Sequence, residues 1–247
     1  MTASKRAVVF EPHNDDLVIG MGGTVQQLLA DGWTVSSIVM TDGRYGSSEL
    51  TPSETKRIRG EEKRREAERL GVDYRELELE DMQLQAHYHD PDARERIRSI
   101  LVRALPDSGP LTVFVPPPSE AHPDHRATYS FVQDVCEEVD VETRVVRYLV
   151  WEVPFFTHGV DRAGTVLKVD VDDDFEEKIS SIAVHESQET ERGYTDLART
   201  FNEYLAHLYP GEADRAELLS VIDSNPPLVE SLECEDVTRM FHDDSGD

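Results

Sequence analysis

Two short stretches of the chain gather side chains that bind metal ions or transfer protons. The first holds His13, Asp15 and Asp16, and the second holds His122, Asp124 and His125. Imidazole nitrogens and carboxylate oxygens together suit Zn²⁺ or a related divalent metal. A catalytic metal site needs three protein ligands and an open position, and hydrolysis also needs a base for the water and a donor for the oxyanion. Six candidate groups can fill all these roles, so the pattern predicts a metal-dependent hydrolytic site.

A simpler interpretation of the same residues is structural. Asp15 or Asp16 would cap the helix that follows, and the residues from His122 to His125 would be solvent-exposed side chains of a polar loop. In a chain with 51 acidic residues, pairs of His and Asp also arise by chance. The positions of the two stretches in the fold therefore decide how much weight they carry.

Short apolar runs alternate with amphipathic segments along most of the chain. The predicted strands cover residues 6–10, 35–40, 74–79, 111–115, 144–153 and 165–171, and the predicted helices cover 17–31, 52–70, 91–105, 125–139, 175–186 and 191–208. The sharpest boundary is at Thr51, Pro52 and Glu54, which combine a capping box with Pro at the first helical position. This alternation predicts an α/β fold with a mostly parallel sheet, helices on both faces and a helical C-terminal extension.

Ligands of such sheets bind beyond the carboxyl ends of the strands, where the strand order reverses. In a 3-2-1-4-5 order this crevice lies between strands one and four. The first stretch follows strand 6–10 and the second follows strand 111–115. We therefore expect the two stretches to face each other across one crevice.

The stretch from Pro12 to Gly23 resembles the first motif of the PIG-L (LmbE-like) deacetylase family, and the stretch from His122 to His125 is similar to its second motif. The likeness covers roughly residues 6 to 190. It extends through further matching positions, namely Thr41-Asp42-Gly43, Arg59-x-x-Glu62, Leu70-Gly71-Val72, Asp81, Lys178 and His185-x-Ser187-Gln188. Two positions differ, because Asn14 stands where the family usually has Pro and Leu17 where it usually has Glu.

The resemblance implies a Rossmann-like, zinc-dependent amidase that removes acetyl groups from N-acetylglucosamine-type sugars or conjugates. It implies a domain of this type over residues 1–190, with 191–247 as a helical acidic extension packed on it. The implied metal ligands are His13, Asp16 and His125, for Zn²⁺ or for Fe²⁺, Mn²⁺ or Co²⁺. Asp15 would be the general base, His122 the imidazolium that stabilises the oxyanion and protonates the leaving amine, and Asp124 the residue that orients His122.

Three more residues are candidate substrate contacts: Arg59, Asp81 and Arg44. Arg59 has an alternative interpretation as a surface ion pair with Glu62 or Glu66, and Asp81 as a partner of a catalytic histidine. Gly20-x-Gly22-Gly23 suggests a phosphate cradle, but it lies within an apolar helical run where small residues allow close packing. Two further functions stay open: an amidase for another N-acyl or thiol conjugate, and a non-catalytic Rossmann-like binding module.

The charge composition of the chain limits the classes of molecule that it can bind. The chain has 25 Lys and Arg against 51 Asp and Glu, a formal net charge of −26 at pH 7. This charge repels nucleic-acid phosphates and anionic lipids, so we expect a small-molecule substrate, no nucleic acid and no membrane, with a homo-oligomer left open. The acidic excess, with arginine outnumbering lysine, favours a halophilic protein. The sequence has no apolar run long enough for a signal or spanning helix, which predicts a cytoplasmic location.

Overall fold

A computed structural model describes the chain except residues 1–4, 140–141, 151–163, 210, 222–225 and 239–247. The strands are β1 (Arg6–Glu11), β2 (Thr34–Thr41), β3 (Asp73–Leu79), β4 (Leu111–Val115), β5 (Thr143–Tyr148), β6 (Thr165–Asp170), β7 (Ala216–Val221) and β8 (Cys234–Asp236). The α-helices are α1 (Asp16–Ala30), α2 (Pro52–Leu70), α3 (Pro91–Ala104), α4 (Pro123–Glu138), α5 (Phe175–Ile182), α6 (Glu186–Arg192), α7 (Tyr194–Leu208) and α8 (Pro226–Glu230). A 3₁₀ turn, η1, spans Leu84–His87.

The strands form one sheet in the order β3-β2-β1-β4-β5-β7-β6-β8. The first five strands in this order are parallel, whereas β7 is antiparallel to both β5 and β6, and β8 is antiparallel to β6. The 3-2-1-4-5 order on which the expected place of the crevice depends is therefore present. Its reversal point lies between β1 and β4, which pair with Val8 opposite Val113.

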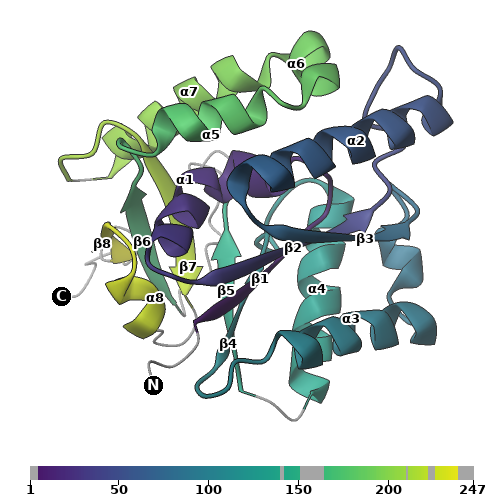
Figure 1. The fold of residues 1–247 in the computed structure, drawn as a ribbon, viewed down its shortest axis with the longest axis horizontal. Helices are drawn as coiled ribbons and strands as arrows, with labels where there is room; N and C mark the ends of the chain where they lie inside the picture. The colour runs from purple at the N-terminus through teal and green to yellow at the C-terminus, as the bar shows by residue number, and fades with distance from the viewer. Residues whose placement is uncertain (1–4, 140–141, 151–163, 210, 222–225, 239–247) are drawn as a thin grey trace, which may run out of the picture.

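Helices cover both faces of the sheet (Figure 1). Helices α1, α2, α5 and α7 lie on one face, and α3 and α4 lie on the other. Alternate side chains of the central strands enter two separate cores, as Val9 and Val8 of β1 do. The predicted fold class is confirmed. No helix in the part of the chain described here is long and apolar enough to cross a bilayer.

Helix α1 packs tightly against the sheet through glycine. A Cβ on Gly23 would lie 2.5 Å from Cγ1 of Val171, and one on Gly20 would lie 2.8 Å from the ring of Tyr148. The helix is also kinked, because Met21 has φ −147° and ψ 27°. These glycines are packing positions inside the helix, which agrees with the interpretation preferred over a phosphate cradle.

The start of α2 forms as the sequence predicts. The Thr51 hydroxyl accepts the Glu54 amide at 3.4 Å, and a Glu54 carboxylate oxygen accepts the Thr51 amide at 3.1 Å. Gly71 ends the helix in the left-handed conformation, with φ 76°. Local chemistry thus defines both ends of the longest helix in the fold.

The fold departs from prediction mainly in the C-terminal part. The segment expected as one helix over 191–208 is divided at Gly193, with φ 63°, into α6 and α7. The extension expected to be helical also supplies β7, which lies inside the sheet between β5 and β6. Strand β5 ends at Tyr148, and residues 151–153 of the predicted strand lie outside the described residues.

Candidate active site

The two stretches with metal-binding and proton-transferring side chains meet at the carboxyl ends of β1 and β4. His13 lies in the turn between β1 and α1, and His122 is the N-cap residue of α4. Because β1 and β4 are adjacent and parallel, the two turns lie on the same edge of the sheet. The predicted juxtaposition is therefore present in the structure.

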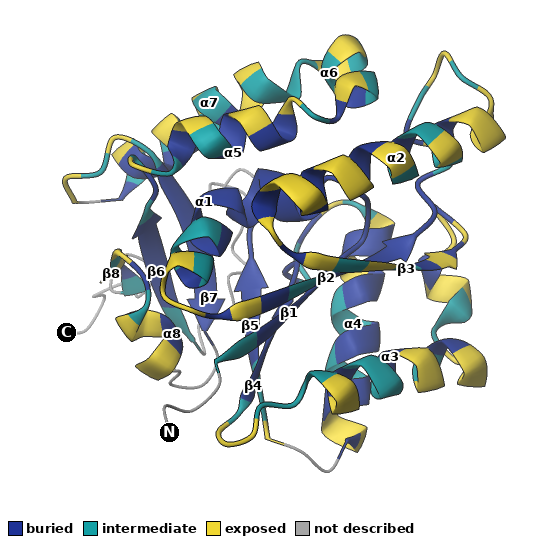
Figure 2. Ribbon diagram, in the orientation of Figure 1, coloured by how far each residue is buried: buried dark blue, intermediate teal, exposed yellow. Residues whose placement is uncertain are grey.

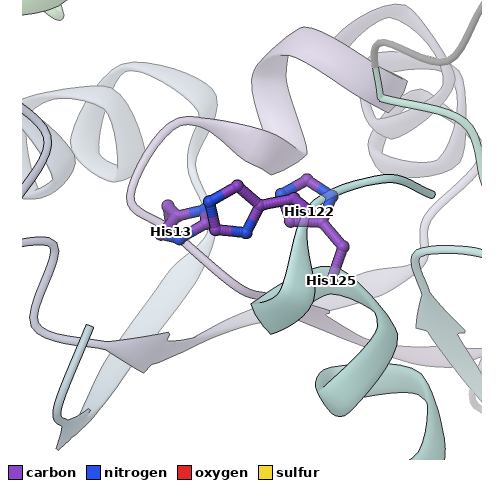
Figure 3. Close-up of side chains that lie close together, drawn as sticks. All are labelled: His13, His122 and His125. Carbon is purple, nitrogen blue, oxygen red and sulfur yellow. The ribbon is translucent and has the colours of Figure 1, made fainter. Parts of the chain in front are cut away.

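Three imidazole rings form the centre of the site (Figure 3). The ring centroids of His13 and His122 are 4.7 Å apart, those of His122 and His125 are 5.1 Å apart, and those of His13 and His125 are 5.3 Å apart. Each ring offers a nitrogen, and these three atoms lie within 4.8 Å of one another. This spacing is compatible with a single metal ion.

One oxygen of Asp16 joins His13 and His125. Asp16 Oδ2 accepts the His13 amide at 2.8 Å, lies 3.2 Å from His13 Nδ1 and lies 3.4 Å from His125 Nε2. Burial raises the pKa of Asp16, but the charges and hydrogen bonds of the two histidines outweigh burial and hold the pKa well below its usual value. Asp16 is therefore an anionic oxygen placed between two imidazoles.

Asp15 faces a different partner. Its Oδ1 accepts a hydrogen bond from Arg59 Nη2 at 2.7 Å, and both side chains are almost fully buried. The second oxygen, Asp15 Oδ2, has no hydrogen-bond partner among the described residues, and Asp15 lines the cavity. Arg59 thus orients the carboxylate through one oxygen, and no described residue binds the other.

His122 is held through the main chain. Its Nδ1 accepts the Asp124 amide at 3.3 Å, which places the proton of a neutral ring on Nε2. Burial and the charges of His13 and His125 lower the pKa of His122 to about 4. The ring is therefore neutral near pH 7 in this structure, whereas the family resemblance implies an imidazolium.

The Asp124 carboxylate contacts other groups than His122. It accepts the amides of Met82 at 2.7 Å and Leu84 at 3.1 Å, and Oδ2 lies 3.6 Å from His13 Nε2. The side chain therefore fixes the loop after β3 and approaches His13. Any orienting effect of Asp124 on His122 comes from its backbone amide.

Asp81 lies beside Asp124 on the other side of His13. Asp81 Oδ1 is 3.4 Å from His13 Nε2, and Oδ2 accepts the Tyr45 amide at 2.9 Å. Burial raises the pKa of Asp81, but the hydrogen bond and charge of His13 outweigh it, and the pKa is lowered to about 2. The structure places Asp81 against a histidine, the alternative that the sequence left open.

The cavity above these groups has a volume of about 530 Å³. Its lining includes the predicted residues His13, Asp15, Asp16, Arg59, Asp81, His122 and His125. Arg44 is not among these lining residues, and its Nε donates to Asp42 Oδ2 at 2.8 Å, so its contact with substrate stays a prediction.

Sequence reasoning missed one buried acid of the site, Glu120. One Glu120 oxygen is hydrogen-bonded to His125 Nδ1, and the other accepts the Val150 amide at 3.0 Å. A carboxylate on the distal nitrogen fixes the ring and tautomer of a ligating histidine. The available signal was an acidic residue in the turn after β4, two positions before His122.

Two further wall residues, Arg192 and Tyr194, come from the junction of α6 and α7. Arg192 donates to the Gly46 carbonyl at 2.9 Å and to the Tyr194 hydroxyl at 2.7 Å. The contact with Gly46 joins the junction to the loop after β2. The sequence contained no spacing that linked these residues to the histidines.

Comparison with known proteins places these features in a family. The family model described as GlcNAc-PI de-N-acetylase, PIG-L, matches residues 8–136. Diacetylchitobiose deacetylase of Thermococcus kodakarensis is 32% identical over 199 residues, covering 74% of this chain and 70% of that protein. The N,N'-diacetylchitobiose deacetylase structure from Pyrococcus horikoshii has a TM-score of 0.67 and 28% identity, covering 89% of this chain and 84% of that one.

A match to a more distant structure shows a shared fold. The 4-carboxy-2-hydroxymuconate hydratase from Pseudomonas putida has a TM-score of 0.68 at 18% identity, and the match covers 90% of this chain and 97% of the hydratase. Fold alone therefore does not fix the reaction. The family match spans both stretches of His and Asp residues and runs from within β1 to within α4, and so the chain belongs to the PIG-L family.

Proposed function

We propose that the protein is a metal-dependent amide hydrolase that removes the acetyl group from an N-acetylglucosamine-type sugar or sugar conjugate. Family membership and the deacetylase relatives support this reaction. The observation that carries it is that one cavity holds both the cluster of His13, Asp16 and His125 and the buried carboxylate of Asp15. One oxygen of Asp15 accepts a hydrogen bond from Arg59, and the other has no partner among the described residues.

The side chains fit a divalent metal. His13, Asp16 and His125 would hold the ion through two nitrogens and one oxygen, a donor set that suits Zn²⁺ and also Fe²⁺, Mn²⁺ or Co²⁺. When bound, the ion supplies Lewis acidity and a water of lowered pKa. The Glu120 carboxylate on His125 supports this assignment, because such partners fix the orientation of ligating histidines.

Asp15 is the proposed general base. Hydrolysis forms a bond between the water oxygen and the acetyl carbon, and it breaks the bond from that carbon to the amide nitrogen. Asp15 accepts the proton that the water loses, through the oxygen that Arg59 does not hold. Positioned proton transfer of this kind contributes roughly 10²–10⁴-fold to the rate.

His122 is the proposed donor on the other side of the reaction. Its Nε2–H is positioned to stabilise negative charge on the amide oxygen, since Nδ1 already accepts the Asp124 amide. The leaving nitrogen needs one proton, and we assign its delivery to the Asp15 carboxyl that has taken the water's proton, because a neutral His122 has no acidic proton to give. Arg59 and Asp81, which line the cavity, remain the proposed contacts to the sugar hydroxyls.

Metal removal tests the proposed reaction. We expect the purified protein to release acetate and free amine from N-acetylglucosamine or N,N'-diacetylchitobiose, to lose this activity after chelation and to regain it with Zn²⁺. The matched control is the same sample dialysed without chelator. Full activity in a metal-free sample contradicts the mechanism. Cleavage of N-acetyl amino acids in preference to the sugars supports a different amidase, and absence of both metal and turnover supports a binding module.

A further inference from the structure

The buried face of α2 is charged, although a buried helix face is normally apolar. The buried charged residues on this helix are Arg59, Glu62, Lys63 and Glu66, and their spacing places them on one face. Figure 2 shows α2 with its outer side exposed and its inner side buried. Burying a charge costs free energy unless the charge is paired. The partners of these four side chains therefore indicate the role of the buried face.

Lys63 is paired with Glu11, the last residue of β1. Lys63 Nζ lies 2.6 Å from Glu11 Oε1 and 2.8 Å from Glu66 Oε1, and all three side chains are fully buried. Glu66 in turn lies 2.6 Å from Nε2 of His185. The lysine is therefore held between two carboxylates, one of which belongs to the strand that leads into the active site.

Glu11 bridges the two ends of the catalytic turn. Its Oε2 accepts the Leu17 amide in the first turn of α1 at 3.0 Å, and Oε1 accepts the Ser37 hydroxyl of β2. The residues between Glu11 and Leu17 include His13, Asp15 and Asp16. One carboxylate thus sets the separation of the two ends of the segment that carries half of the site, and it does so from outside the cavity.

We propose that Glu11 and Lys63 are positioning residues of the active site, and that their ion pair fixes the turn from His13 to Asp16 in the geometry that binds metal. The proposal rests on the proposed function for its catalytic part only, since metal binding can be measured without substrate. Neither residue lines the cavity, so the pair acts through the turn and not on the sugar.

A second buried pair in the same protein provides a matched control. Lys178 Nζ lies 2.7 Å from Glu217 Oε1, and both side chains are fully buried. Glu217 also accepts amides of α1, those of Gly23 at 2.9 Å and Thr24 at 2.8 Å. Both pairs consist of a lysine and a glutamate that are fully buried, and in both the glutamate accepts backbone amides of α1. They differ in position: the Leu17 amide adjoins the turn from His13 to Asp16, whereas the amides of Gly23 and Thr24 lie further along the helix.

The test compares Glu11→Gln/Lys63→Met with Lys178→Met/Glu217→Gln. Each double variant removes a lysine together with a carboxylate that pairs with it, because a buried charge left without a partner is costly. In the first variant Glu66 also loses Lys63, but it keeps His185 Nε2, 2.6 Å from its carboxylate. We measure the Zn²⁺ dissociation constant by competition with a chelator, thermal unfolding of the metal-free proteins, and kcat and KM. The first variant should lose roughly 10–100-fold in zinc affinity, as for other groups that orient metal ligands. Its kcat should fall with KM nearly unchanged, and the control should keep both zinc affinity and kcat.

A graded pair of single variants separates positioning from packing. Glu11→Gln keeps an oxygen that can accept the Leu17 amide, so it should retain more zinc affinity than Glu11→Ala. Wild-type zinc affinity in Glu11→Gln/Lys63→Met overturns the proposal, as does an equal loss in the control. Failure of the first double variant to fold while the control folds also overturns it. A wild-type protein that binds zinc but releases no acetate refutes the proposed function and leaves the affinity comparison decisive.

Discussion

Two adjacent aspartates of the catalytic turn have different surroundings. Asp16 contacts the rings of His13 and His125, whereas Asp15 contacts the guanidinium of Arg59. The two carboxylates therefore point to different partners. This difference fits the proposed division of labour, in which Asp16 would be a metal ligand and Asp15 the general base.

Substitution of each aspartate tests this division. Asp15→Asn should keep its metal and lose roughly 10²–10⁴-fold in kcat, because an amide cannot accept the proton of the water. Asp16→Ala should bind metal more weakly, because it removes the oxygen between two histidines. Metal content and kcat are measured together for both variants. Arg44→Gln is measured beside them, and unchanged kcat and KM would argue against its predicted contact with substrate.

The opposite pattern is equally informative. An Asp15→Asn protein that has lost its metal would reverse the two roles. A fully active Asp15→Asn protein would remove Asp15 from the mechanism altogether. Loss of activity in Arg44→Gln would support the contact of that residue with substrate.

The chemical groups of the site were more predictable than its walls. His13 and His125 could be placed together because each follows a strand whose neighbours in the sheet could be inferred. The hydrogen bond from the Arg44 guanidinium to Asp42 could not be predicted, because a sequence does not show which of several nearby acids an arginine binds. Arg192 and Tyr194 could not be found, since the contact of the α6–α7 junction with the loop after β2 depends on tertiary packing.

At the level of helices and strands, local sequence signals predicted where some elements begin and end. Elements that depend on burial in the tertiary structure could not be predicted in this way. Helix α2 begins where its capping box requires. Strand β7 was missed because its residues, Ala216–Val221, are buried throughout and show no alternation that distinguishes a strand from a short helix. The break at Gly193 was missed because a glycine within an amphipathic run is compatible with a continuous helix.

Two helical glycines give a prediction at the level of the element. Gly23→Ala should destabilise the protein by about 1–3 kcal/mol, since the new methyl would overlap Val171. Gly60→Ala, in the interior of α2, should instead be neutral or stabilise by up to about 1 kcal/mol, because the new Cβ would meet the Glu76 carboxylate at ordinary contact distances, 3.4 Å for Oε1 and 3.9 Å for Oε2. Urea unfolding of both variants measures the difference. Equal effects of the two substitutions would show that α1 does not pack on the sheet this closely.

The whole molecule carries a large excess of acidic charge, and this gives a prediction about salt. With a net charge of −26, self-repulsion opposes the compact state. Raising KCl from about 0.1 M to 1 M shortens the Debye length from about 10 Å to about 3 Å. We therefore expect the thermal midpoint and the activity to rise over this range. A neutral osmolyte at equal osmolality is the control, and a flat or falling midpoint in KCl contradicts the halophilic interpretation.

The two outer strands of the sheet also affect how copies of the folded chain meet in concentrated solution. At one edge, β3 exposes Asp73, Arg75 and Glu78, and Glu78 has a left-handed φ of 49°. At the other edge, β8 is only three residues long and exposes Glu235 and Asp236. Charged, irregular or very short edge strands are poor templates for another strand. The folded protein should therefore resist edge-to-edge aggregation even where salt has screened the repulsion between molecules.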